Sequence, residues 1–307
     1  MKKTAFLFPG QGSQAVGMGK SFYDHSEEAR RIFKKADEVL GYSLSKLCFE
    51  GPEDELKLTQ NTQPALLTVS TIAYRLLGHT PALAAGHSLG EYSALVAAGA
   101  LRFEDAVLLV HKRGKYMQEA VPVGVGAMAA VIGLGYDAIE AAIGQVKSGV
   151  VQIANWNAAD QIVISGHKQA VEEALQLAQP PRSVMLPISA PFHSPLMKSA
   201  EERLAVDLDA VAFSDLNFPI VTNVDAKMIQ TGVQARDGLK WQVSRPVMWS
   251  KSMESLAGEG IGAFVEIGAG KVLIGLIKRI GRGFSHPFTM LNVEDIDSLG
   301  KAKSALE

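Results

Sequence analysis

A serine between two glycines is the feature that most constrains how this chain can fold. The segment GHSLG, residues 86–90, follows the apolar run ALAA and precedes the helical pattern EYSALVAAG. A strand that turns sharply into a helix at such a site exposes the serine hydroxyl at the helix N-terminus. The segment therefore predicts an α/β fold with Ser88 as a nucleophile, and the alternative is that Ser88 only caps the helix.

The segments on either side of this turn continue the same alternation. Short apolar runs predict strands, and longer runs with apolar residues at helical spacing predict helices. Ser26 is a suitable N-cap and Gly41 a suitable C-cap for one helix, and Pro64 is expected to begin another. The expected strands are 4–8, 82–86, 218–224 and 263–270, and the expected helices are 26–40, 64–77, 89–98 and 103–120. Such alternation indicates a mostly parallel sheet covered on both faces.

The order of the expected strands and helices changes in the middle of the chain. Between residues 126 and 189 the expected order is strand, helix, strand, strand, helix, strand, which is that of a ferredoxin-like unit. We therefore predict a large α/β domain of residues 1–124 and 191–307, interrupted by a ferredoxin-like domain of residues 125–190. An inserted domain creates a cleft where it joins its host, and ligand sites are frequent in such clefts.

Composition excludes several classes of function. The 307 residues include 30 basic and 32 acidic side chains, and the net charge of −2 offers no general attraction to nucleic acid or to an anionic membrane. No apolar run approaches the ~20 residues that span a bilayer. Cys48 is the single cysteine, so an intrachain disulfide and a cysteine-based metal site are both excluded. We expect a cytoplasmic protein that needs no metal and no redox cofactor.

A serine nucleophile needs a base, and seven histidines are available. His193 lies between two prolines in APFHSPLM, where the chain re-enters the large domain and can face the expected cleft. His286 is the rival, because ordinary α/β-hydrolases place the histidine near the C-terminus, after an acid that would here be Asp225 or Glu266. The residues alone leave both histidines open.

Three other patterns carry no functional signal of their own. The glycines of GQGSQA, residues 10–15, fit a dinucleotide fingerprint, but no second strand places an acid ~20 residues further on. The segment GAGKV, near Gly268, lacks the first glycine and the Ser/Thr of a phosphate-binding loop. Arg113 lies between Lys112 and Lys115, and such a run is typical of a solvated helix face.

Eight segments, in order along the chain, give the sequence a family resemblance. They are FPGQGSQ, TQPALLTVS, GHSLGEYSALVAAGAL, HKRGKYMQ, GAMAAVIGL, APFHSPLM, WQVSRPVMW and EIGAGKVLIGLIKRI. Together they resemble the malonyl-CoA:acyl carrier protein transacylases of type II fatty acid synthesis, over essentially the whole chain. The resemblance implies a hydrolase-like core with a mostly parallel sheet, an inserted ferredoxin-like domain, and a monomer. The chain departs from the family pattern at Ala269 and in the turn at residues 157–160.

The resemblance also implies a catalytic pair. Ser88 is then the nucleophile and His193 its base, which decides against His286. The family has no carboxylate as a third member, and the backbone carbonyl of the residue matching Gln242 orients the histidine instead. Such a carbonyl fixes the imidazole tautomer as a carboxylate would.

Further site residues follow from the same resemblance. The backbone N–H groups of Gln11 and Leu89 are expected to form the oxyanion hole. Arg113 acquires a role, because the matching arginine in the family makes a bidentate contact with the free carboxylate of the malonyl group, so that acetyl should be rejected. Phe192 matches a bulky residue suited to an unbranched malonyl group, and Gln63 matches a glutamine near the site.

The implied reaction is a ping-pong transfer without cofactors. Ser88 takes the malonyl group from malonyl-CoA, and the phosphopantetheine thiol of acyl carrier protein then removes it. Carrier proteins of this kind are acidic, which favours a basic docking patch at the rim of the cleft. The alternatives are a trans-acting acyltransferase of polyketide synthesis, a serine thioesterase or esterase, and a carrier-binding module without catalysis.

Overall fold

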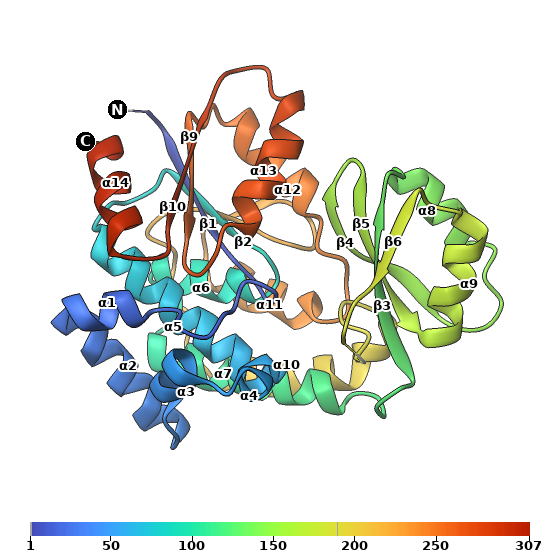
Figure 1. The fold of residues 1–307 in the computed structure, drawn as a ribbon, viewed down its shortest axis with the longest axis horizontal. Helices are drawn as coiled ribbons and strands as arrows, with labels where there is room; N and C mark the ends of the chain where they lie inside the picture. Colours follow the sequence, from blue (N-terminus) through green and yellow to red (C-terminus); the bar gives the residue numbers. More distant parts are fainter. Residues whose placement is uncertain (1, 189) are drawn as a thin grey trace.

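The computed structural model describes residues 2–188 and 190–307, and its larger part is built on one sheet (Figure 1). Within the described residues this sheet has six strands in the order β10-β9-β1-β2-β7-β8. The strands are β1 (Thr4–Phe8), β2 (Leu83–Gly86), β7 (Ile220–Val221), β8 (Met228–Ile229), β9 (Ala263–Ile267) and β10 (Thr289–Val293). Their pairings are parallel except that of β7 with β8. The mostly parallel sheet expected from the sequence is confirmed.

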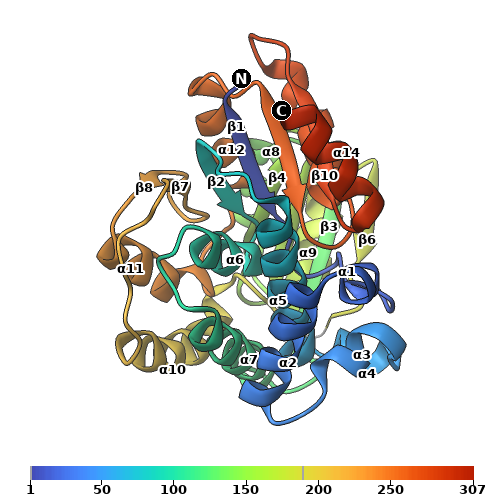
Figure 2. The same ribbon diagram turned by 90° about the vertical axis from the view of Figure 1, so that its left-hand side faces the viewer.

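Helices cover both faces of this sheet. They are α1 (Lys20–His25), α2 (Glu27–Leu40), α3 (Leu44–Glu50), α4 (Glu53–Lys57), α5 (Thr59–Leu77), α6 (Leu89–Ala97), α7 (Phe103–Glu119), α10 (Lys198–Asp209), α11 (Gly232–Gln242), α12 (Trp249–Gly258), α13 (Val272–Ile280) and α14 (Ile296–Leu306). In Figure 2, α6 lies against β1 and β2 and α7 lies beyond it. No helix in the described part of the chain is long and apolar enough to cross a membrane.

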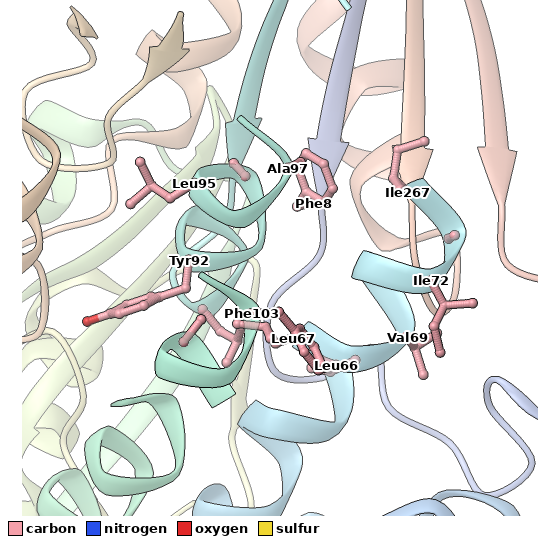
Figure 3. Close-up of a cluster of buried hydrophobic side chains, with 14 of the residues drawn as sticks. Phe8, Leu66, Leu67, Val69, Ile72, Tyr92, Leu95, Ala97, Phe103 and Ile267 are labelled. Carbon is pink, nitrogen blue, oxygen red and sulfur yellow. The ribbon is translucent and has the colours of Figure 1, made fainter. Parts of the chain in front are cut away.

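The two helical layers follow from the alternation of side chains along buried strands. On β1, Phe6 and Phe8 join one hydrophobic cluster with α2, α5, α6 and α7, whereas Ala5 and Leu7 join another with α12 and α13. Figure 3 shows part of the first cluster, in which Phe8 and side chains of α5 and α6 lie close together. Each large aliphatic or aromatic side chain buried in this way contributes roughly 1.5–3 kcal/mol to stability.

A second sheet lies to the right of the first in Figure 1. It is antiparallel in the order β4-β5-β3-β6, and α8 and α9 belong to the same unit. The element bounds are β3 (Gly126–Ile132), α8 (Tyr136–Ile143), β4 (Val151–Ala158), β5 (Gln161–His167), α9 (Lys168–Ala178) and β6 (Arg182–Met185). This is the expected ferredoxin-like order of elements. The division into domains 1–124 with 191–307 and 125–190 is retained as a proposal.

Hydrogen bonds attach β4 to the segment of the larger unit that lies between α11 and α12. The N–H of Trp156 donates to the carbonyl of Val247 at 2.9 Å, and the N–H of Val247 donates to the carbonyl of Ala154 at 2.8 Å. Gln152 Nε2 donates to the carbonyl of Ser244 at 3.2 Å. These bonds fix the small sheet against the segment between α11 and α12, and so fix one wall of the cleft between the two units.

The predicted start of one helix is wrong. α5 begins at Thr59 and contains Pro64, which the sequence places at its first turn. Pro64 has no N–H to donate to the carbonyl of Gln60, four residues before it. The ring Nδ1 of His111, on α7, lies 2.9 Å from that carbonyl oxygen and supplies a donor in its place. A tertiary hydrogen bond therefore allows the helix to continue through a proline.

Replacing His111 with Ala should lower the free energy of unfolding by about 1–2 kcal/mol, because it leaves a helix carbonyl without a donor. Urea titration followed by circular dichroism measures this change. His111→Asn should recover part of the loss, since its side-chain NH₂ can reach the same oxygen. His25→Ala, at an exposed helix end, is the control and should change little. Equal stability of the His111→Ala and His25→Ala variants would contradict this account.

Candidate active site

Ser88 occupies a strained turn between β2 and α6. Its φ of 50° and ψ of −106° are rarely adopted by residues other than glycine. A Cβ on Gly86 would lie 1.9 Å from the backbone of Gly90, and a Cβ on Gly90 would lie 2.0 Å from the carbonyl oxygen of Phe8. The two glycines of GHSLG therefore permit a close approach of the turn to β1, which holds the serine in its unusual conformation.

The structure brings Ser88 and His193 together. Ser88 Oγ lies 2.8 Å from His193 Nε2. On the other side of the ring, Nδ1 lies 2.9 Å from the backbone carbonyl oxygen of Gln242 and 3.1 Å from that of Arg245. Because a carbonyl oxygen only accepts, Nδ1 carries the proton and Nε2 is free to accept the serine proton. The imidazole thus has the tautomer that a general base requires.

The surroundings of His193 keep it neutral. The side chain is almost completely buried. Burial, reinforced by the nearby positive charge of Arg113, lowers the pKa of His193 to about 3. The ring therefore stays in its basic form throughout the physiological pH range.

Arg113 is buried, so the solvated helix face suggested by its lysine neighbours is wrong for this residue. Its Nη1 donates to Gln63 Oε1 at 2.8 Å. Its Nη2 donates to Gln242 Oε1 at 2.9 Å and to Ser88 Oγ at 3.2 Å. Lys112, the preceding residue on α7, instead pairs with Asp207 at 2.6 Å. Consecutive residues of a helix point in different directions, so Arg113 enters the site whereas Lys112 pairs with Asp207 outside it.

A cavity of about 100 Å³ lies at the catalytic pair. Gln11, Leu89 and Phe192 line it together with Ser88, His193 and Arg113. Within the described residues the backbone N–H groups of Gln11 and Leu89 have no hydrogen-bond partner, so both remain available to a bound oxygen. Met128 and Asn155 line the same cavity from the small sheet. The site thus lies between the two units, where the sequence predicts a cleft.

Asn223 is a site residue that sequence reasoning missed. Ser88 N–H donates to its Oδ1 at 2.6 Å, and its Nδ2 donates to the carbonyl of Gly86 at 2.6 Å. One side chain therefore holds both ends of the strained turn. The sequence does carry a signal for it, because Asn223 lies near the carboxyl end of the strand predicted at 218–224, where functional side chains gather. In the structure β7 ends at Val221, and Asn223 follows it.

His87 links the two units beside the nucleophile. Its Nε2 lies 2.9 Å from Asn157 Oδ1, and its ring packs against Trp249 at a centroid distance of 5.3 Å. Burial lowers the pKa of His87, so it is neutral as well. The ring therefore directs its Nε2 toward the small sheet.

The rival residues of a hydrolase lie elsewhere. His286 Nε2 is 3.0 Å from the carbonyl oxygen of Ala257, on α12. The carboxylate of Glu266 accepts hydrogen bonds from the backbone N–H groups of Leu273 and Ile274, at the start of α13. The structure therefore does not bring His286 or Glu266 to Ser88.

A serine nucleophile beside a neutral histidine base is suited to acyl transfer through a serine ester. The chain belongs to the acyl transferase domain family, whose model matches residues 5–304. It is an acyltransferase, and its relatives narrow the class further. It is 49% identical over 290 residues to the malonyl CoA-acyl carrier protein transacylase of Bacillus subtilis strain 168, covering 92% of each chain.

Two solved structures agree with this assignment. The malonyl CoA-acyl carrier protein transacylase of Coxiella burnetii is 42% identical, with a TM-score of 0.95 over 99% of this chain and 98% of that chain. A malonyl-transacylase in complex with a type II PKS acyl-carrier protein is also 42% identical, with a TM-score of 0.95 over 99% of each chain. The hydrolase-like core with a ferredoxin-like insertion is thus confirmed as the fold of this family.

The depressed pKa of His193 predicts that Ser88 stays reactive in mild acid. A base with an ordinary histidine pKa would lose about tenfold in rate per pH unit below roughly 6.5, whereas His193 remains unprotonated until much lower pH. The rate of Ser88 labelling by an uncharged fluorophosphonate should therefore be flat from about pH 8 to about pH 5.

Arg113→Ala provides a matched comparison, because removing the cation should move the acid limb of labelling to higher pH. Intact-protein mass spectrometry at each pH measures the labelled fraction. A wild-type limb near the ordinary histidine value would contradict the assignment of a buried, neutral base.

Proposed function

We propose that Ser88 carries a malonyl group from malonyl-CoA to the phosphopantetheine thiol of acyl carrier protein, which supplies fatty acid chain elongation. One observation carries the proposal. Ser88 Oγ lies 2.8 Å from a neutral imidazole and 3.2 Å from a buried guanidinium. The nucleophile therefore lies beside both its base and a cation that can bind the substrate's carboxylate. The names of the relatives support the same donor and acceptor.

In the first half-reaction, Ser88 Oγ attacks the thioester carbonyl while His193 Nε2 takes the hydroxyl proton. The carbonyl oxygen becomes negative, and the N–H groups of Gln11 and Leu89 stabilise it by about 3 kcal/mol each. The C–S bond then breaks, and the proton on His193 passes to the departing CoA sulfur. The carbonyl of Gln242 holds the imidazole in place during both transfers.

Arg113 selects the acyl group. Its Nη atoms now bond neutral oxygens, and its buried Nε has no partner among the described residues. A malonyl carboxylate would exchange neutral contacts for a direct, charge-assisted pair, whereas an acetyl group would bring no anion into contact with the buried guanidinium. Phe192 lines the space beside the base and would limit branching at the malonyl C2.

In the second half-reaction, the carrier's thiol takes the place of CoA. Its proton passes to His193, its sulfur attacks the malonyl ester, and Ser88 recovers the proton from His193. Water is the competing acceptor. A cavity of about 100 Å³ that is filled by the malonyl group leaves little room for water, and Arg113 holds the ester in one orientation.

A carrier protein of polyketide synthesis is a second candidate acceptor. One solved relative was captured with a type II PKS acyl-carrier protein, and its fold matches this chain with a TM-score of 0.95. Transfer rates from the malonyl-enzyme to a fatty acid carrier and to a polyketide carrier, measured side by side, decide between them. We expect the fatty acid carrier to be preferred.

We further propose that the protein acts in the cytoplasm as a monomer. A single, buried cysteine fits a reducing compartment, and the expectation of a monomer rests on the family resemblance. Sedimentation equilibrium tests the oligomeric state.

The proposed function predicts a single malonyl adduct on the wild-type protein after brief mixing with malonyl-CoA. Intact-protein mass spectrometry detects it. The adduct should be absent from the Ser88→Ala variant, strongly reduced in rate in His193→Ala, and unchanged in His286→Ala. Added holo carrier protein should discharge the adduct and gain the same mass.

Other outcomes would overturn this function in identifiable ways. Release of free malonate without an accumulating adduct would indicate a hydrolase. Loss of acylation in His286→Ala but not in His193→Ala would show that His286, and not His193, is the base. An inert Ser88 would indicate a carrier-binding module without catalysis.

A further inference from the structure

The side chain of Gln242 connects the parts of the site. Its Oε1 accepts from Arg113 Nη2 at 2.9 Å. Its Nε2 donates to the backbone carbonyl of Ser88 at 2.9 Å and to Glu91 Oε2 at 2.7 Å. A carboxylate only accepts and a guanidinium only donates, so these two neighbours fix which end of the amide faces which. Glu91 therefore acts on Arg113 through one intervening amide.

Glu91 is buried, and its two hydrogen bonds reach only one of its two carboxylate oxygens. It lies on the first turn of α6 and is 2% exposed. Both of its hydrogen bonds, from Gln242 Nε2 and from the backbone N–H of Asn223 at 3.2 Å, reach the same oxygen, Oε2. Within the described residues Oε1 has no protein donor. It is therefore the oxygen that can take up a proton without breaking a contact.

A second cavity gives Glu91 access to solvent from behind the active site. It has a volume of about 380 Å³ and is lined by Glu91 together with residues of the β7–β8 region and α11. The charged groups that face Glu91 here and on the site's side are Arg113, Asp225, Lys227, Asp237 and Arg245. A proton can thus reach Glu91 without passing through the cavity that holds the malonyl group.

Glu91 and a bound malonyl carboxylate share one cation. Burial raises the pKa of Glu91 to about 7, while Gln242, Asn223 and Arg113 act in the opposite direction. A second anion bonded to Arg113 would withdraw part of that stabilisation and raise the pKa of Glu91 further. The protonation of Glu91 and the binding of malonyl are consequently linked, and the linkage is reciprocal.

We propose that Glu91 is a positioning residue and the counter-charge of Arg113, balancing it as an anion in the free enzyme and taking up a solvent proton when malonyl binds. The proton adds to Oε1, and no bond of the substrate breaks. The inference rests on the proposed function, since it assumes that Arg113 binds the malonyl carboxylate. It makes the affinity for malonyl pH-dependent while leaving the affinity for a neutral acyl group unaffected.

The test uses the Ser88→Ala protein, in which binding is separated from acylation. Calorimetry gives the Kd of malonyl-CoA and of acetyl-CoA from about pH 6 to about pH 8.5, and their ratio cancels the titration of the CoA phosphates. We expect the malonyl Kd, relative to that of acetyl-CoA, to rise about five- to tenfold over this range. Repeating the titration in buffers of different ionisation enthalpy should reveal proton uptake with malonyl-CoA alone.

Glu91→Gln removes the charge and can keep both contacts at the oxygen that replaces Oε2. In the Ser88→Ala background it should abolish the pH dependence and the proton uptake. Glu266→Gln is the matched control, because Glu266 is also buried with its pKa raised to about 7 but contacts the start of α13. It should leave both measurements unchanged.

The outcomes separate this inference from the proposed function. If malonyl-CoA binds no better than acetyl-CoA at any pH, the clamp and with it the proposed function fail. If malonyl-CoA is preferred but the pH dependence is absent, or persists in Glu91→Gln, only the role of Glu91 is overturned. Should Glu91→Gln fail to fold, proton uptake by the Ser88→Ala protein still decides the question.

Discussion

The buried positive charge of Arg113 is the interaction on which the rest of the site depends. Its guanidinium has lost its hydration, and its hydrogen bonds reach the neutral oxygens of Gln63, Gln242 and Ser88. A cation in such surroundings favours any ligand that brings an anion to it. Burial, and after it the same charge, lowers the pKa of His193 and keeps the imidazole unprotonated. Arg113 thus contributes both to substrate choice and to the protonation state of the base.

The packing of α7 against α5 helps to hold the charge of Arg113 away from water. A Cβ on Gly114 would lie 2.6 Å from the carbonyl oxygen of Thr59, so the glycine after Arg113 lets α7 approach α5 closely. That approach places Gln63 beside the guanidinium. The small sheet, fixed along β4, closes the other side, and the strained turn at Ser88 places the nucleophile against both. Each contact is ordinary, and their convergence produces the chemistry.

Local signals in the sequence predict local structure well. The caps at Ser26 and Gly41 and the turn at Ser88 depend on a few neighbouring residues, and they are found where the sequence puts them. The start of α5 is mispredicted because the hydrogen bond that Pro64 cannot make is replaced by one from His111, on another helix. Likewise, no pattern near Arg113 or Glu91 reveals their burial, which is set by packing between segments far apart in the chain. The family resemblance supplies residue roles that spacing alone leaves open.

The most direct test of the central claim is the preference for malonyl-CoA over acetyl-CoA in serine acylation, measured as the ratio of kcat/KM values. The wild-type protein should favour malonyl-CoA by on the order of 100-fold or more, because acetyl brings no anion into contact with the buried guanidinium. Arg113→Ala should lose nearly all of that preference, and Arg113→Lys should recover little of it, since a single ammonium cannot make the bidentate contact. A malonyl preference that survives in Arg113→Ala would contradict the account.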